Sequence, residues 1–138
     1  MIVVIHYPVG LNLFPVALLP GINQAFQTAE DAELLFSMNK IPAAVNRIYY
    51  SVFYCLLAFG LKYDFKTSKH LQLIGWFNKT FIATGKINND YGRIVRDCYE
   101  YRKSADYDAV VNIEYSDVEL LLDEMKSFLN MAKEYLTR

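Results

Sequence analysis

The segment that most constrains the fold runs from Pro42 to Phe59 and is apolar on almost every side. Its apolar residues recur at helical spacing: Val45, Ile48, Tyr49, Val52, Phe53, Leu56 and Phe59. A helix that is apolar all round has to be covered by other helices, so it belongs at the centre of a bundle. Its few polar or amphipathic side chains also follow helical spacing: Arg47, Tyr50, Ser51 and Tyr54.

Four other segments have apolar residues on one helical face, the pattern of helices that cover such a core. We expect these helices at about 23–38, 69–84, 90–103 and 116–136, with a loop rich in Asp and Tyr at 104–115. Asn39 suits a left-handed turn, Pro42 suits the first turn of the central helix, and Gly60 is expected to end that helix. Ser116 and Glu119 have the spacing of a capping box. The sequence therefore predicts an all-α, up-and-down bundle of about five helices.

The first twenty-two residues contain no Lys, Arg, Asp or Glu and so superficially resemble a membrane segment. Pro8, Pro15 and Pro20 break any continuous helix, and no basic flank precedes the apolar run. A secretory signal peptide would need a positively charged start and a small-residue cleavage site. We expect residues 1–22 to form an extended N-terminal arm, or to be an over-extended translation start, and residues 23–138 to form one domain.

The charge and aromatic content narrow the functional classes. The formal net charge of -1 argues against a globally basic nucleic-acid binder, but a local basic patch is compatible with it. With eleven Tyr and nine Phe, part of the aromatic surface is expected at a subunit interface. Cys55 and Cys98 fall inside apolar helical patterns, so we expect buried free thiols and a cytoplasmic protein.

An arginine interrupts the apolar side of the fourth predicted helix. The apolar residues of that face are Tyr91, Ile94, Val95, Cys98 and Tyr101. Arg102 lies four residues after Cys98 and therefore projects along the edge of the same face. A guanidinium turned inward requires a carboxylate, a carbonyl or an anionic ligand, and Asp106 and Tyr107 are the nearest candidates. This conflict predicts a functional site, although Arg102 could instead anchor the helix end by pairing with Asp106.

Several short motifs, taken in order, resemble those of the HEPN domain family. The run from Ala43 to Phe53 is similar to the second-helix signature of that family. Further similar segments follow in the same order: Ser68-Lys69-His70, Phe77-Asn78-Lys79 and Thr84-Gly85-Lys86-Ile87. The segment from Arg102 to Tyr107 matches the family's R-x-x-A-D-Y variant. The resemblance covers roughly Asn23 to Leu136, and its motifs are jointly more specific than any one of them.

The resemblance implies a dimer-forming helical bundle, often encoded beside a minimal nucleotidyltransferase as a toxin–antitoxin pair. Many HEPN domains are metal-independent ribonucleases that use an Arg and a His four to six residues apart. Here Arg102 is present, but Tyr107 stands five residues later and no His follows it. A His side chain accepts a proton near neutral pH, because its ordinary pKa is about 6.5, whereas a Tyr with a pKa near 10 does not do so readily.

The candidate catalytic residues are Arg102, Asp106 and Tyr107, and the candidate nucleic-acid-binding residues are Arg47, His70 and Arg96. His70 is expected either to supply the missing histidine in space or to be a helix cap or surface residue. Arg47 is expected to stack on Tyr50 or Tyr54, or to reach across a dimer interface. No metal or cofactor is expected, because the two His and two Cys are scattered and no glycine-rich phosphate loop occurs.

Two main hypotheses for function follow. In the first, which we prefer, the chain is a homodimer that binds a minimal nucleotidyltransferase partner in a toxin–antitoxin-like module, with RNA or nucleotide binding and no membrane association. In the second, it is a metal-independent ribonuclease with Arg102 in a composite dimer site. A bundle that binds polynucleotides without catalysis would show salt-dependent binding focused on Arg47, Arg93, Arg96 and Arg102. Because Arg47 and Arg102 interrupt apolar patterns, the second and fourth helices are expected to line a shared cleft.

Overall fold

The structure, a computed structural model, describes residues 19–107 and 113–138. Within these two ranges the chain forms five α-helices and one π-helical turn, and no strand. The elements are α1 (Leu19–Ser37), α2 (Ile41–Lys62), α3 (His70–Phe77), the π-helical turn η2 (Asn78–Ile82), α4 (Asn89–Tyr107) and α5 (Tyr115–Leu136). The predicted all-α fold of about five helices is therefore confirmed.

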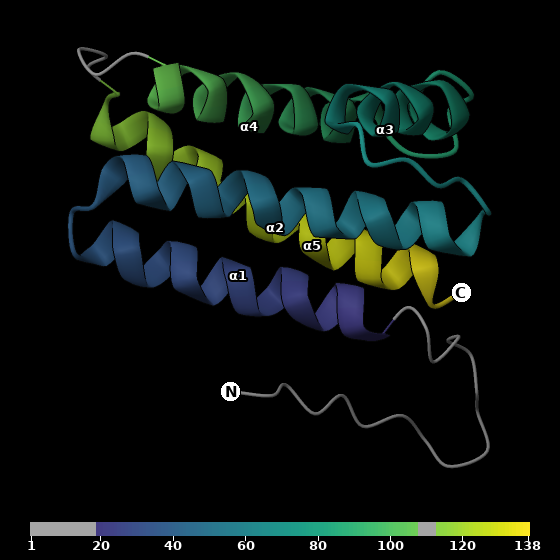
Figure 1. Cartoon of the computed structure of the whole chain (residues 1–138), viewed down its shortest axis with the longest axis horizontal. Helices are drawn as coiled ribbons and strands as arrows, with labels where there is room; N and C mark the ends of the chain where they lie inside the picture. Colours follow the sequence, from purple (N-terminus) through teal and green to yellow (C-terminus); the bar gives the residue numbers. More distant parts are fainter. Residues whose placement is uncertain (1–18, 108–112) are drawn as a thin grey trace.

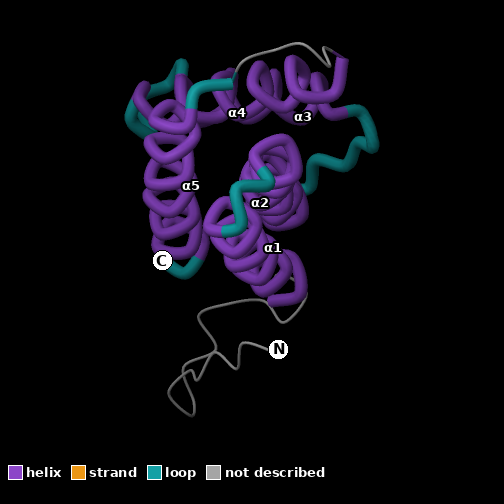
Figure 2. The backbone as a smooth tube through the Cα atoms, turned by 90° about the vertical axis from the view of Figure 1, so that its left-hand side faces the viewer, coloured by secondary structure: helices purple, strands orange, loops and turns teal. Residues whose placement is uncertain are grey.

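The apolar helix α2 lies at the centre of the bundle, as its sequence predicts. It packs against α1, α3, α4 and α5. Figure 2 shows it between α1 and the layer formed by α3 and α4, with α5 to one side. The four long helices alternate in direction along the bundle, which is the up-and-down arrangement (Figure 1). By length and composition α2 could cross a membrane, but 67% of its most apolar stretch is buried among the other helices, so the core accounts for its apolar character.

Aromatic side chains fill the core between α2, the α3–η2 segment and α5. Phe59 of α2 packs edge-on against both Phe77 and Phe81, with ring centroids 5.1 Å apart in each case. Phe128 of α5 approaches Phe77 from the other side, at 5.9 Å. These four rings are almost completely buried, and burying a side chain of this size contributes roughly 1.5–3 kcal/mol. The high aromatic content of the sequence is thus used largely for packing within the chain.

The N-terminal boundary of the domain differs from the predicted one. α1 begins at Leu19 rather than near residue 23, so residues 19–22 of the predicted arm belong to the bundle. Pro20 is compatible with this start, because the first turn of a helix does not use its backbone N–H groups. Ile22 is fully buried and anchors that turn. The remainder of the predicted arm, residues 1–18, lies outside the described residues.

Other helix ends also depart from the predictions. α2 continues past Gly60 to Lys62, and the capping box is not formed, because Glu114 is the N-cap of α5 and makes no side-chain cap hydrogen bond. In contrast, Asn39 has the predicted left-handed conformation, with φ of 58°. Gly85 has φ of 75° after η2 and so also ends its helix as predicted.

Candidate functional site

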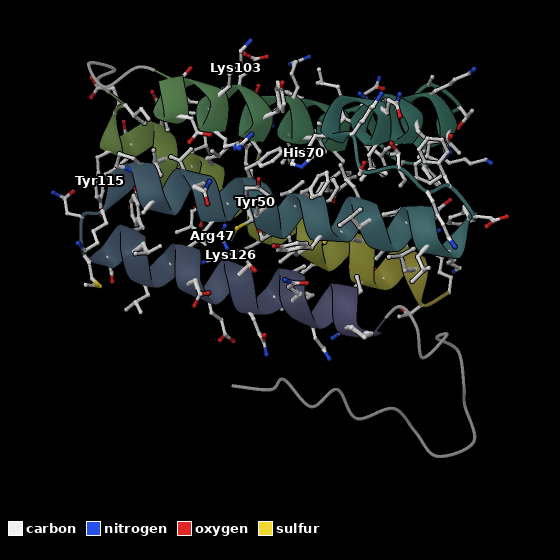
Figure 3. The ribbon with its side chains drawn as sticks, viewed as in Figure 1. Arg47, Tyr50, His70, Lys103, Tyr115 and Lys126 are labelled. Carbon is white, nitrogen blue, oxygen red and sulfur yellow. The ribbon has the colours of Figure 1, made fainter. Side chains whose placement is uncertain are left out.

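The site predicted around Arg102 is assembled from three helices. Tyr49 and Tyr50 come from α2, His70 is the first residue of α3, and Arg102 lies near the end of α4. Figure 3 shows His70 lying against α2 on the side of α4, with Tyr50 and Arg47 nearer the N-terminal end of α2. We call Arg102, Asp106, Tyr49, Tyr50 and His70 the Arg102 cluster.

The R-x-x-A-D-Y segment is helical rather than part of the predicted loop, because α4 continues to Tyr107. Arg102 and Asp106 are therefore four residues apart on one helix, the spacing at which side chains lie next to each other. Arg102 Nε lies 3.2 Å from Asp106 Oδ2 in a salt bridge. The side chain of Tyr107, the third candidate catalytic residue, lies outside the described part of the structure.

The Arg102 guanidinium is drawn inward onto two tyrosine rings. Its Cζ atom is 5.3 Å from the ring centroid of Tyr49 and 5.4 Å from that of Tyr50, within range of cation–π attraction. Nη2 makes a long hydrogen bond of 3.5 Å to Tyr50 Oη. Nε is buried beside the Asp106 carboxylate and makes no aligned hydrogen bond within the part of the chain that the structure describes. The inward arginine with a carboxylate companion that the sequence predicts is thus present, and 26% of its side chain remains exposed.

His70 lies in the same cluster, which sequence reasoning left open. Its Nδ1 is 2.8 Å from Tyr49 Oη, and its ring stacks on Phe53 with centroids 4.0 Å apart. Burial lowers the pKa of His70 below its usual value, and the positive charge of Arg102 lowers this pKa further. Burial also raises the pKa of Tyr49, by more than Arg102 lowers it. A neutral Tyr49 phenol therefore faces a neutral imidazole: it donates to Nδ1 when the imidazole hydrogen is on Nε2, and it accepts from Nδ1 in the other tautomer.

The two other predicted arginines are in different situations. Arg47 donates two hydrogen bonds to Asn46 Oδ1, and its Cζ is 5.2 Å from the Tyr50 ring centroid, so the predicted stacking on Tyr50 is confirmed. Tyr50 thus connects Arg47 of α2 with Arg102 of α4. Arg96 does not join them: its side chain is 66% exposed and its nearest carboxylate is Asp97, at 3.8 Å.

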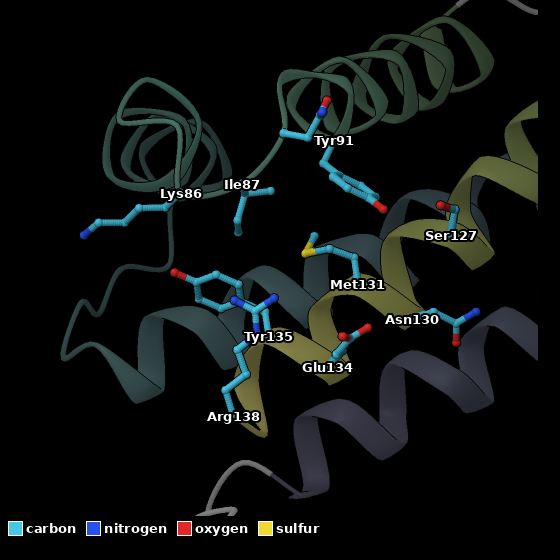
Figure 4. Close-up of a pocket in the computed structure, with 10 residues that line it drawn as sticks. Lys86, Ile87, Tyr91, Ser127, Asn130, Met131, Glu134, Tyr135 and Arg138 are labelled. Carbon is cyan, nitrogen blue, oxygen red and sulfur yellow. The ribbon is translucent and has the colours of Figure 1, made fainter.

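Two hollows lie outside the cluster. The larger, about 580 Å³, lies between the loop before α4 and the last turns of α5, and Figure 4 shows Lys86, Glu134 and Arg138 around it. It contains no predicted site residue and its charges are mixed. The second, about 460 Å³, lies between the α3–η2 segment and α4, and we call it the α3–α4 hollow. Arg96 and Tyr99 line it, and Tyr99 also touches the Tyr49 ring at 5.9 Å, so this hollow adjoins the Arg102 cluster.

Sequence reasoning missed the contribution of Tyr49, which it placed in the apolar core. The side chain is almost fully buried, as expected for a core residue, but its hydroxyl reaches His70. A buried phenol normally needs a hydrogen-bond partner, and this requirement could have indicated that Tyr49 has a polar neighbour.

Cys55 and Cys98 are buried free thiols, as predicted, and burial raises the pKa of both. The described residues include no group of three or more His, Cys, Asp or Glu side chains that could hold a metal ion.

Comparison with known proteins agrees with this fold. The family model of the HEPN domain matches residues 21–135. A Methanocaldococcus jannaschii protein named "Putative toxin MJ0142" is 36% identical over 115 residues, which cover 83% of this chain and 78% of that protein. A Thermotoga maritima protein named as a UPF0332 protein is 33% identical over 113 residues, covering 82% of this chain and 86% of its own length. A second Methanocaldococcus jannaschii protein, named "Putative toxin MJ0605", is 30% identical over 115 residues, which cover 83% of this chain and 85% of that protein. The chain therefore belongs to the HEPN domain family.

Proposed function

We propose that this HEPN protein is the toxin-like component of a two-protein module and that it binds RNA through the Arg102 cluster. Family membership and the names of two relatives support a toxin–antitoxin-like role. We further propose that it forms a homodimer and binds a minimal nucleotidyltransferase partner, as the resemblance of its motifs to HEPN proteins implies. The site is assigned to RNA because Arg and His side chains that converge beside aromatic rings suit phosphate and base together.

The position of Arg102 carries this proposal. A guanidinium that only anchored a helix end would have its donors satisfied by the helix and its neighbours. Among the described residues, Nε faces the Asp106 carboxylate at 3.2 Å without an aligned hydrogen bond, Nη2 has one long bond to Tyr50, and a quarter of the side chain faces solvent. The two tyrosine rings hold the charge in place while leaving donors for an anion. In the tautomer with its hydrogen on Nε2, the neutral His70 would add another donor to the same phosphate.

Binding of single-stranded RNA is expected to weaken about 10- to 100-fold in Arg102→Ala, the effect of losing a hydrogen-bonded charged contact. The slope of log affinity against log salt is expected to fall by about 0.7, because one phosphate contact is removed. Fluorescence anisotropy with a labelled oligonucleotide at several salt concentrations measures both quantities. Arg138→Ala is the matched control, because Arg138 also lies over a tyrosine, with Cζ 5.0 Å from the Tyr135 ring, at the far end of α5. If Arg102→Ala and Arg138→Ala bind RNA with equal affinity, the Arg102 cluster is not the RNA-binding site.

Exposed apolar side chains support the proposed protein contacts. Leu57 and Leu61 lie four residues apart on α2, and Leu34 and Met38 are similarly spaced from α1 into the turn that follows it. Apolar residues grouped on a surface are typical of contact sites between proteins. In size-exclusion chromatography with light scattering the chain is expected to have the mass of a dimer. When it is co-expressed with a minimal nucleotidyltransferase, the two proteins should elute together. Separate elution would contradict the proposal that they bind each other.

Cleavage of RNA is the second candidate function, and one observation favours it. The structure brings His70 into the cluster of Arg102, although the sequence lacks a His after the arginine. A neutral imidazole could take the proton of a ribose 2′-hydroxyl as its oxygen bonds to phosphorus. The bond from phosphorus to the 5′-oxygen breaks, that oxygen takes a proton from water, and Arg102 stabilises the negative charge that develops on the phosphate. This role needs the tautomer with the imidazole hydrogen on Nδ1, where Tyr49 Oη accepts it, and with Nε2 free. Binding is therefore ranked before cleavage.

If His70 is a general base, His70→Asn is expected to reduce the cleavage rate about 100-fold or more without unfolding the protein. The rate of the wild-type protein should be constant near pH 7 and should fall only below about pH 6.5, because burial and Arg102 lower the pKa of His70 and a protonated imidazole accepts no proton. Gel assays of a labelled RNA across this pH range, in the presence of a chelator, measure the rate. A rate that is unchanged in His70→Asn would exclude this histidine as the base.

A further inference from the structure

We infer that the α3–α4 hollow is a subsite for one nucleobase of the RNA bound at the Arg102 cluster. This inference rests on the proposed function and specifies its substrate: single-stranded RNA with an unstacked base, preferably adenine. The hollow, about 460 Å³, is within the size range of small-molecule sites and large enough for a nucleoside. Its walls combine apolar side chains with a few polar ones, chiefly Leu71, Ile74, Ile82, Asn78, Arg96 and Tyr99.

Asn78 supplies the first argument, because its side-chain amide is incompletely used. Asn78 lines the hollow, and its Oδ1 is buried without a hydrogen-bond partner among the described residues. Buried polar atoms are normally paired, so an unpaired one requires an explanation. The terminal torsion of an asparagine is soft, and a turn of the amide would present its acceptor and donors to a ligand. An asparagine amide pairs with the N6 and N7 positions of adenine, which is the reason for the expected preference.

The backbone around Asn78 supplies a second argument. Asn78 begins the π-helical turn η2, and its carbonyl accepts the hydrogen bond of the Ala83 N–H, five residues on, at 2.8 Å. Such turns are rare and occur frequently at functional sites. On the facing helix α4, a Cβ atom at Gly92 would lie 3.2 Å from Ile82 Cγ2 and 3.5 Å from Asn78 Oδ1. Glycine at this position therefore lets η2 approach α4 closely while offering Asn78 no side chain as a partner.

Two arginines line the hollow, and only Arg96 has a guanidinium that is available to a ligand. Arg93 forms salt bridges with Asp90, Asp97 and Glu124. Arg96 is largely exposed, and its carboxylate neighbour Asp97 is 3.8 Å away, so its guanidinium can pair with a ligand. Tyr99 lines the hollow, and its ring also contacts the Tyr49 ring of the Arg102 cluster. Arg96 precedes Arg102 by six residues, a rise of about 9 Å with the side chains about 120° apart around the helix axis, and Tyr99 lies between them in sequence. A base in the hollow and a phosphate at Arg102 would therefore belong to neighbouring nucleotides of one strand.

The experiment compares hexaribonucleotides of adenine, of uracil and without bases, by fluorescence anisotropy. The wild-type protein is expected to bind oligoadenylate about tenfold more tightly than both oligouridylate and the abasic strand of equal charge. Asn78→Leu should remove this preference and should keep or raise Tm, because it replaces an unpaired buried polar group with an apolar one of similar size. Asn23→Leu is the matched control: Asn23 Oδ1 is also buried, with no hydrogen-bond partner within residues 19–107 and 113–138, but Asn23 does not line the hollow. This variant should keep the wild-type preference.

The outcomes separate this inference from the proposed function. An adenine preference that persists in Asn78→Leu would overturn the base subsite, while weaker RNA binding in Arg102→Ala than in the wild-type protein would still support the phosphate site. If the wild-type protein binds no RNA, the proposed function fails, and a nuclear magnetic resonance titration with adenosine monophosphate and with ribose 5-phosphate decides the subsite. Shifts of the Gly92 amide that require the adenine ring would support it. Equal shifts with both compounds, or none, would overturn it.

Discussion

Gly60→Ala is expected to destabilise the protein by about 1–3 kcal/mol, the effect of overpacking a filled site. This change would normally stabilise a helix by about 0.5–1 kcal/mol, because alanine favours helical backbone. Here the new Cβ would lie 2.5 Å from the carbonyl oxygen of Phe65, a backbone atom that cannot move without its segment. The Phe65 N–H donates a 2.8 Å hydrogen bond to the Gly60 carbonyl, so the same contact holds the connection from α2 to α3.

This connection also positions the candidate site, so the substitution is expected to affect RNA binding. The segment that Phe65 fixes leads directly to His70, the first residue of α3. Thermal and urea unfolding measure the stability change, and RNA affinity measured on the folded protein measures the displacement of His70. Gly75→Ala is the matched control, because a Cβ at that helical glycine meets no atom within 4 Å. Equal stability of the two variants would show that the close approach at Gly60 is not a constraint.

Gly60 also illustrates what the sequence could and could not predict about the fold. The apolar periodicity of α2 and α5 is sufficient to predict which faces are buried, because a helix face has a fixed spacing. A glycine within such a pattern has two meanings, the end of a helix or a close contact, and only the packing of distant segments distinguishes them. The same holds for Leu71, which the periodicity places on the buried face of its helix but which is 63% exposed. The π-helical turn Asn78–Ile82 likewise contains one extra residue, which shifts the face of the side chains that follow it in a way the regular spacing does not predict.

The candidate site was predictable only where its residues share one helix. Arg102 and Asp106 lie four residues apart, so their pairing follows from helix geometry alone. His70 is 32 positions before Arg102, and its approach depends on how α3 packs across α2. No local pattern encodes that packing, so the sequence could state the role of His70 only as an alternative. The family motifs include both His70 and Arg102, but they do not indicate the hydrogen bond between Tyr49 and His70.

Arg102→Met is expected to separate the structural from the functional explanation of the arginine. Methionine keeps most of the packing against Tyr49 and Tyr50, and the Asp106 carboxylate that loses its partner is partly exposed to water. Asp106 keeps contact with water, and a partly exposed ion pair contributes little to stability, so the unfolding free energy should change by less than about 1 kcal/mol. RNA affinity should nevertheless fall about 10- to 100-fold, because methionine has no donor for a phosphate.

Arg93→Met provides the contrast, because Arg93 has the structural role that is the alternative for Arg102. Arg93 binds three carboxylates, and Glu124 among them is mostly buried, with 16% of its side chain exposed. Removing Arg93 leaves that carboxylate without its partner and is expected to lower the unfolding free energy by about 1–3 kcal/mol in urea titrations. If Arg102→Met destabilises the protein as much as Arg93→Met does, Arg102 anchors the end of α4. If only Arg93→Met destabilises the protein, the inward charge of Arg102 is not required for folding, and binding an anion becomes the better explanation for the position of Arg102.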